Sequence, residues 1–457
     1  MLATIRKVWM LTLGYVLTAA SVQAQVESAI LNQYVATAFA SNEGIKQQNI
    51  QFEQGLNALK QAKSFYYPNV SLSADYMRAA GGRTIDLPIG DLMNPVYSTL
   101  NQLTHSNNFP TIKNESFQLN PDNYYDAKVR TAMPLINTEI RYNERIKKVL
   151  LDKNQAALNV YKRELAKNVK EAYLHYCQAS NAEVIFANSL TLVNENVRVN
   201  KSLVKNGVKN NTVLLRSESE AEKLKAQLEE ARNNKTAARL YFNFLLNRPD
   251  ESEIIVDTTL GQNAEEDLAI PAGMNNDVLT QIATGEKAFE LAKKMTQTTY
   301  VPKVATFLDM GSQGNNFKFD NKTAYFIWGI NLKWDLFAGG MNNLKRKSYE
   351  LEIDNTQSQY RMVRDANDLE HKQAWLNLKT NQAKYKSART QLKMAQRYYN
   401  DQLKAYKEGT VLYIELVDAL NQLTTAELQE SISRANILLS RVQIERVNSL
   451  IDLNSIK

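Results

Sequence analysis

Two very long stretches without glycine or proline constrain this chain more than any other feature. Neither residue occurs in residues 137–206 or 341–408, runs of 70 and 68 residues. Shorter clean runs follow at 208–248 and 410–457, and all four are rich in residues that favour helix, such as Ala, Leu, Lys, Glu and Gln. A helix of 70 residues is about 100 Å long. Because compact domains do not contain such helices, the runs predict a coiled coil or a helical tube.

The apolar spacing inside the runs indicates helices that bury a narrow stripe and leave their other faces in water. Steps of three and four residues separate one set in the first run: Leu158, Tyr161, Leu165, Val169, Ala172 and Tyr176. A more polar set continues the pattern in the second run: Leu369, Lys372, Trp375, Leu376 and Lys379.

Each long run ends at a glycine that is expected to turn the chain into a partner helix. Gly207 closes the first run and Gly409 the second, 202 residues later. Glycine at this position ends a helix in the left-handed conformation. The sequence therefore predicts two long helical hairpins, and their similarity indicates one structural unit that occurs twice.

The segments before the long runs also correspond. Residues 66–70 (YYPNV) match residues 300–304 (YVPKV) at an offset of 234. This offset is 32 residues larger than the 202 residues between the turn glycines, so the first copy is longer by that amount. The extra residues fall within residues 78–122, which contain four prolines and many Asn and Ser. This composition predicts an irregular surface loop in the first copy.

Four segments between the prolines and the long runs alternate in polarity. They lie near residues 69–76, 124–133, 304–310 and 325–334, and the third is the weakest because Phe307 falls on its polar side. The fourth places Phe326, Trp328, Ile330, Leu332 and Trp334 on one face. Strands of about ten residues with one apolar and one polar face are typical of membrane barrels. A soluble sandwich, or a hairpin packed on helices, would alternate in the same way.

The first 24 residues read as a secretory signal peptide, with basic residues, an apolar core and a small-residue cleavage site before Gln25. No later stretch approaches twenty apolar residues. A membrane position of the mature chain would therefore require a β-barrel. Four strands cannot close one, since about eight are needed and eight leave no lumen. If the barrel conducts solute, several subunits must each contribute four strands. Two subunits would give a plugged barrel of eight, and three would give twelve strands with an open lumen and helices that continue the tube.

Several functional classes are poorly supported. The formal charge of +7 falls to +5 without the signal peptide. Over a chain of this length, so weak a positive charge does not indicate nucleic-acid binding. Cys177 is the only cysteine, and the three histidines, His105, His175 and His371, are far apart in sequence. Together with the lack of a nucleophile, phosphate-loop or metal motif, this predicts no enzyme activity and no cofactor.

Taken together, these features resemble the TolC-like outer-membrane efflux proteins over essentially the whole mature chain. The motifs are the prolines Pro68 and Pro302 within their aromatic-x-Pro-x-Val sequences, and residues 334–340 (WDLFAGG), which end in Gly339 and Gly340. Residues 133–137 (MPLIN), with Pro134, are the weaker counterpart in the first copy. These junction residues are expected to join strands to helices.

The resemblance implies a mainly α fold with a small β part. Long antiparallel helical hairpins would form an α-barrel, and four strands per subunit would contribute to a twelve-stranded trimeric β-barrel. It implies a channel in the outer membrane of a Gram-negative bacterium, in contact with outer-membrane lipid, that extends into the periplasm. The channel would conduct small molecules or polypeptides passively, together with a periplasmic adaptor and an inner-membrane pump, in efflux or type I secretion.

The resemblance also implies roles at the two turns. Gly207, Val208, Gly409 and Thr410 would form the hairpin tips where adaptors dock. Glu415 and Asp418 occupy the positions of the acidic residues that narrow family tunnels, and three subunits would bring six carboxylates near one axis, where they attract cations. Acids in a first helical turn also simply favour the helix dipole.

Closure of the tip is harder to predict. Tyr406 matches an aromatic position associated with a latch between the two turns. The Asp and Arg of that latch are replaced here by Val213 and Val411. A polar latch of this kind is therefore not expected.

The expected organisation is a signal peptide (1–24), a first repeat (25–248), a connecting periplasmic segment (249–275) and a second repeat (276–457). The repeats would contain β-hairpins near 69–135 and 303–336. The lumen-facing candidates, which are Asp126, Lys128, Arg130, Asn331 and Lys333, are mixed in sign and indicate no cargo. The competing interpretation is a secreted coiled-coil structural or interaction protein.

Overall fold

The computed structural model describes residues 28–120, 122–257, 259–261, 276–450 and 453. The predicted signal peptide and part of the predicted connecting segment lie outside these residues. The chain divides into two compact units. The helical unit comprises the described residues of Met1–Asn57, Lys148–Phe289 and Leu351–Lys457, and the sheet unit comprises those of Ala58–Lys147 and Glu290–Glu350. Each predicted repeat contributes segments to both units.

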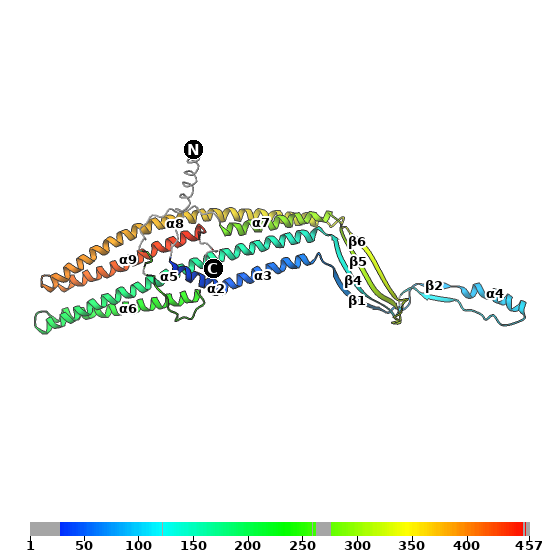
Figure 1. Cartoon of the computed structure of the whole chain (residues 1–457), viewed down its shortest axis with the longest axis horizontal. Helices are drawn as coiled ribbons and strands as arrows, with labels where there is room; N and C mark the ends of the chain where they lie inside the picture. Colours follow the sequence, from blue (N-terminus) through cyan, green and yellow to red (C-terminus); the bar gives the residue numbers. More distant parts are fainter. Residues whose placement is uncertain (1–27, 121, 258, 262–275, 451–452, 454–457) are drawn as a thin grey trace, which may run out of the picture. The chain divides into compact units, whose positions relative to one another are not determined.

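The fold is mainly helical, as predicted (Figure 1). The glycine-free runs form helices of 68, 35, 67 and 35 residues, and the predicted long helices are thereby confirmed. The helices are α2 (Ala29–Ser41), α3 (Glu43–Ser64), α4 (Ile89–Thr104), α5 (Thr138–Lys205), α6 (Asn211–Leu245), α7 (Asp277–Thr296), α8 (Met341–Lys407) and α9 (Tyr413–Val447), with a 3-10 turn at Gln297–Tyr300.

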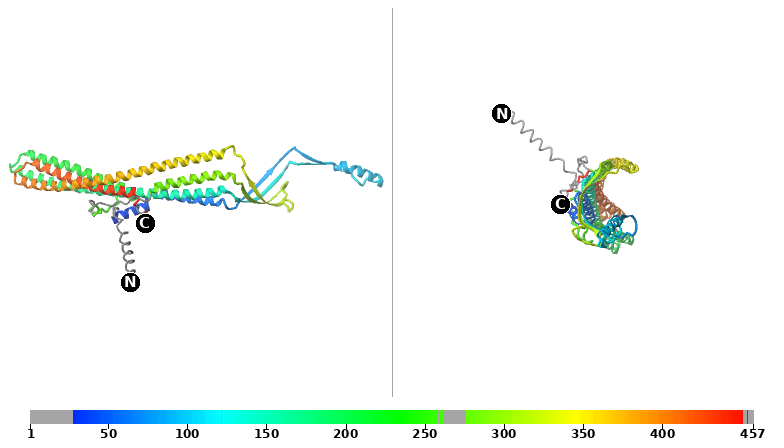
Figure 2. Two further views of the ribbon diagram at one scale, coloured as in Figure 1. Left: turned by 90° about the horizontal axis from the view of Figure 1, so that it is seen from above. Right: turned by 90° about the vertical axis from the view of Figure 1, so that its right-hand side faces the viewer.

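Within the helical unit, α5 with α6 and α8 with α9 form two antiparallel hairpins (Figure 1 and Figure 2). The apolar stripe predicted on α5 is buried, and Leu165, Val169 and Ala172 lie in a core with α2 and α6. Between the two hairpins, the ammonium of Lys170 on α5 lies 2.5 Å from the carboxylate of Glu445 on α9, and both side chains are almost fully buried. This buried ion pair links the first hairpin to the second.

The prediction of which residues of α8 form its buried stripe is wrong. Leu369 and Leu376 are exposed, whereas Ala374, Leu378 and Tyr385 face the core. The core helix α9 approaches α8 along a row that contains small residues, so the larger side chains of that stretch point outward. Lys379 accordingly lies over the ring of exposed Trp375, at 3.7 Å from its centroid.

The sheet unit contains one antiparallel sheet of four strands in the order β1-β4-β5-β6. The strands are β1 (Asn69–Met77), β4 (Tyr124–Ile136), β5 (Lys303–Asn315) and β6 (Ala324–Lys333). All four predicted strands are thereby confirmed. The outer edges of β1 and β6 pair with no other strand among the described residues.

The prediction of an irregular loop at residues 78–122 is wrong. The segment forms a two-stranded ribbon, β2 (Thr84–Leu87) with β3 (Glu115–Gln118), and the sixteen-residue helix α4 between them. Its asparagines were interpreted as turn residues, yet Asn94 and Asn101 hydrogen-bond to the backbone of the returning chain. Those side chains stabilise an ordered structure rather than interrupt it.

None of the described helices combines the length and the apolar character that a membrane crossing requires.

Candidate functional site: the helical turns and the strand sheet

The two predicted turns have the geometry expected of glycine-terminated helices. Gly207 and Gly409 have φ values of 75° and 76°. The N–H of Val208 donates to the carbonyl of Leu203 at 2.9 Å, and that of Thr410 donates to Ala405 at 3.0 Å. These bonds satisfy carbonyls that the helix ends would leave free. Both turns are therefore tightly closed.

The turns adjoin each other in a shared aromatic core. Tyr399, Tyr406 and Tyr413 are buried there with apolar residues of α5, α6 and α9. The rings of Tyr406 and Tyr413 lie 5.6 Å apart between centroids. Burial raises the pKa of Tyr413 to about 12 and also raises the pKa of Tyr406, so both phenols stay neutral at physiological pH.

A buried hydrogen bond near the turns joins the two hairpins. The hydroxyl of Tyr406 on α8 donates to the Asn200 side-chain carbonyl on α5 at 2.5 Å, and Asn200 is 0 % exposed. The prediction singled out Tyr406 but not its partner. Asn200 stands in an apolar series at steps of four and three with Val193, Val197 and Val204, and a polar residue in such a seam is a signal for a specific contact.

The two valines at the latch positions contact this core. Val213 and Val411 are partly buried and pack against the same apolar cluster. Apolar packing, the Tyr406–Asn200 hydrogen bond and a second one between Ser189 and Thr424 at 2.8 Å hold the hairpins together.

The acidic pair lies just beyond the second turn. Glu415 and Asp418 are exposed on one face of α9, three residues apart, while Leu416 and Val417 face the core. Asp418 accepts a hydrogen bond from Gln422 at 2.7 Å. No lysine or arginine neutralises either carboxylate among the described ion pairs. The first turn offers no acidic counterpart, since Val213 occupies that position.

The predicted junction residues lie where strands meet helices. Pro68 and Pro302 directly precede β1 and β5, where a residue without an N–H is tolerated. Pro134 lies inside β4, next to a register shift that follows it. Gly339 and Gly340, at φ 59° and 78°, lead directly into α8.

One face of the sheet is apolar across all four strands. Leu72, Val129, Met310 and Phe326 are register neighbours on this face. At the two edges, Leu72 and Phe326 are 76 % and 75 % exposed. Apolar exposure on this scale is uncommon for a surface in water and typical of one that contacts lipid or protein.

The opposite face carries the predicted polar residues, and four of its charged side chains form two ion pairs. Arg130 donates two hydrogen bonds to Asp309, at 2.7 and 2.6 Å, and Lys128 lies 2.5 Å from Asp126. Phe307 lies on this face, as the sequence indicated, where Gly329 leaves room for its ring. The face thus has no strong net charge in this region.

Aromatic side chains flank the strands at both ends. Tyr67, Tyr300, Trp334 and Phe337 are exposed near the ends that join the helices, and Tyr76, Phe317 and Phe319 are exposed near the opposite ends. Tyr76 stacks on Phe317 at 5.1 Å between centroids. Two aromatic belts separated by about ten strand residues match the two interfaces of a bilayer.

Comparison with known proteins gives a consistent result. Residues 274–447 match the family "Outer membrane efflux protein". No curated protein matches the chain in sequence.

Solved structures of outer membrane channels share the fold across almost the whole chain. The Campylobacter jejuni CmeC outer membrane channel has a TM-score of 0.73 at 14 % identity, with 92 % of this chain and 85 % of that chain covered. VceC, an outer membrane protein of Vibrio cholerae, has a TM-score of 0.70 at 12 % identity, with coverages of 92 % and 95 %. The outer-membrane channel OprN has a TM-score of 0.71 at 16 % identity, with coverages of 93 % and 90 %. The chain therefore has the fold of these outer membrane proteins, and its residues 274–447 match the outer membrane efflux protein family.

Proposed function

We propose that this chain is the outer membrane channel subunit of an efflux or type I secretion system. It would conduct small molecules or polypeptides passively from the periplasm to the exterior of a Gram-negative bacterium. The observation that carries this proposal is the four-stranded sheet with one exposed apolar face, two aromatic belts and two unpaired edges. The family match and the shared fold support it independently.

Three subunits complete the barrel in this proposal. An unpaired edge exposes a row of backbone N–H and C=O groups, which cannot remain unsatisfied in lipid. Pairing β6 of one subunit with β1 of the next satisfies both edges, and three copies close a ring of twelve strands. The apolar face then contacts outer-membrane lipid, and the face with Asp126, Lys128 and Arg130 lines an aqueous lumen.

The helical turns form the periplasmic tip. Three copies of Glu415 and Asp418 would place six exposed carboxylates around the axis and make the entrance cation-attracting. Tyr406 would hold the two hairpins of one subunit together through Asn200. A periplasmic adaptor, coupled to an inner-membrane pump, would dock around Gly207, Val208, Gly409 and Thr410, where Val208 is exposed beside the first glycine.

The similarity of the two hairpins supports an internal two-fold repeat. Their helices are 68 and 35 residues long in the first hairpin and 67 and 35 in the second. Residues 25–248 and 276–457 would be the two copies, joined by the segment at 249–275. They differ most in the ribbon and helix between β1 and β4.

The number of chains in the purified protein–detergent complex tests the proposed oligomeric state. We expect a protein–detergent complex containing three chains, and recovery of the protein with the outer membrane on cell fractionation. Sedimentation with detergent contrast matching measures the number of chains. A monomer that stays soluble without detergent would instead fit a secreted coiled-coil protein.

A further inference from the structure

The segment between β1 and β4 is ordered but has almost no core of its own. Among residues 79–120, all of which are described, only Gly90 is buried. An isolated two-stranded ribbon is only marginally stable in water, and so is an isolated helix of sixteen residues. Additional packing must therefore stabilise this segment in the assembled protein.

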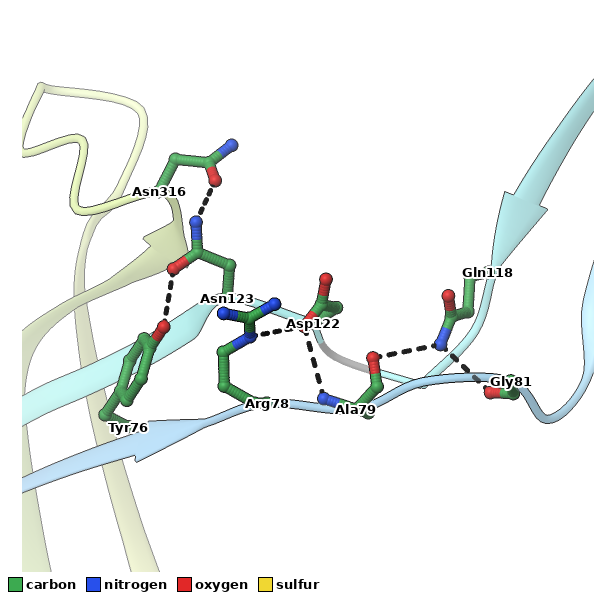
Figure 3. A network of polar contacts seen from close by, with 8 residues as sticks. All are labelled: Tyr76, Arg78, Ala79, Gly81, Gln118, Asp122, Asn123 and Asn316. Atoms are coloured by element: carbon green, nitrogen blue, oxygen red, sulfur yellow. Dashed lines mark hydrogen bonds and ion pairs between the residues drawn. The ribbon is translucent and has the colours of Figure 1, made fainter.

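The base of the segment is fastened to the sheet by a polar network (Figure 3). The guanidinium of Arg78 and the N–H of Ala79 both donate to the carboxylate of Asp122, at 3.1 and 3.2 Å. Tyr76 donates to Asn123 at 2.8 Å, and Asn123 bonds to Asn316 of the neighbouring hairpin. The segment consequently leaves the end of the edge strand β1 in a defined direction.

One face of α4 is covered by the returning chain. Asn94 exchanges two hydrogen bonds with the backbone of Ile112, at 2.9 and 2.8 Å. Asn101 does the same with Phe109, at 2.9 and 3.1 Å. Gly90 permits close approach, because a Cβ there would lie 2.5 Å from the carbonyl oxygen of Ile112. This face of α4 is thus occupied within the subunit.

A second face of α4 carries an exposed seam at steps of three and four residues. The seam consists of Ile89, Leu92, Val96, Thr99 and Leu103. Leu92 and Leu103 are 70 % and 74 % exposed. This spacing is that of the a and d positions of a helix that packs against another helix. Asp91, Ser98 and Gln102 lie on the third, polar face.

Charge distinguishes the possible occupants of the seam. Helices that lie on a membrane surface are rich in Lys and Arg and carry Trp, but residues 88–112 contain none of these and only one charged residue, Asp91. The positions that flank the seam, Met93, Pro95, Leu100 and Gln102, are all uncharged. Parallel copies of one helix bring the flanking positions of neighbouring chains together, so uncharged flanks create no charge repulsion against such packing.

We propose that the seam of α4 packs against the same seam in the other copies of this chain, forming a bundle of three parallel helices at the exterior end of the channel. The inference rests on the proposed trimeric channel. Symmetry brings the three segments to the same end of the barrel, and each leaves from β1, the edge strand that meets the neighbouring subunit. The bundle would supply the missing packing and cover the exterior mouth.

Site-specific disulfide formation tests this contact. In a Cys177→Ser background, Leu92→Cys and Leu103→Cys are each expected to give covalent dimers of the full chain on mild oxidation in outer membranes, because parallel symmetry places each residue beside its own copy. Ser98→Cys, on the polar face, is the matched control and should cross-link at least tenfold less. The number of chains per particle is measured for each variant in detergent.

Each outcome is decisive. Cross-linking at the seam but not at Ser98 in a trimer supports the bundle. A trimer without seam cross-links overturns it and leaves the channel proposal intact, whereas a monomer overturns both. Leu92→Trp in vesicles with brominated lipids identifies the other occupant, since strong quenching would assign the seam to the membrane and contradict the bundle.

Discussion

At the scale of single residues, the contacts that matter most here are polar side chains in apolar surroundings. Asn200 is fully buried and accepts a hydrogen bond from the hydroxyl of Tyr406, which joins α5 of the first hairpin to α8 of the second. The resemblance to a known family marked Tyr406 as a residue associated with a latch between the turns. Its partner Asn200 could not be identified without knowing which faces of α5 and α8 meet. The same resemblance implied a constriction role for Glu415 and Asp418, which lie together on one exposed face of α9.

Replacement of both acids tests that role. Glu415→Ala together with Asp418→Ala is expected to weaken block by a multivalent cation at the periplasmic side at least tenfold, because the proposed ring of carboxylates would be lost. Single-channel recordings with hexamminecobalt measure the block. Glu229→Ala, an exposed acid in the middle of α6, is the matched control and should leave it unchanged. Equal block in the wild type, the double variant and the control would contradict a role of the two acids in the entrance.

At the scale of elements, the long helices and four strands follow directly from the sequence. Glycine-free runs and strict alternation are local signals, so α5, α8 and β6 could be predicted closely. Which helix face is buried depends on the neighbours, and this is why Leu369 and Leu376 were misassigned on α8. The ordered segment around α4 was missed because Asn94 and Asn101 bond to the backbone of the returning chain at Ile112 and Phe109, a pairing that local composition does not reveal.

The turn glycines give a prediction about stability. Gly207→Ala or Gly409→Ala forces alanine into the left-handed region and should each destabilise the fold by about 1–2 kcal/mol. No neighbouring atom lies within 4 Å of the added Cβ, so backbone conformation alone is tested. Gly285→Ala, inside α7, is the opposite control and should stabilise by roughly 0.5–1 kcal/mol. Unfolding monitored by circular dichroism measures all three, and an unchanged midpoint for the turn variants would contradict the left-handed geometry.

At the scale of the whole molecule, the decisive feature is that one chain leaves its sheet unfinished. In the proposed channel, lipid covers the apolar face, and strands of neighbouring subunits pair with the two sheet edges that have no partner strand among the described residues. The strand count in the sequence already indicated an oligomer, and the family match supports an efflux channel. The cargo does not follow from the sequence or from the fold, because the paired charges on the polar face of the sheet select no single class of solute.

Conductance across a planar bilayer tests the central claim most directly. Purified full chain, added in detergent at low concentration, is expected to insert and produce discrete, uniform current steps whose size rises with salt concentration, as a water-filled trimeric pore requires. Protein that binds to the bilayer but never produces such steps would contradict a conducting channel.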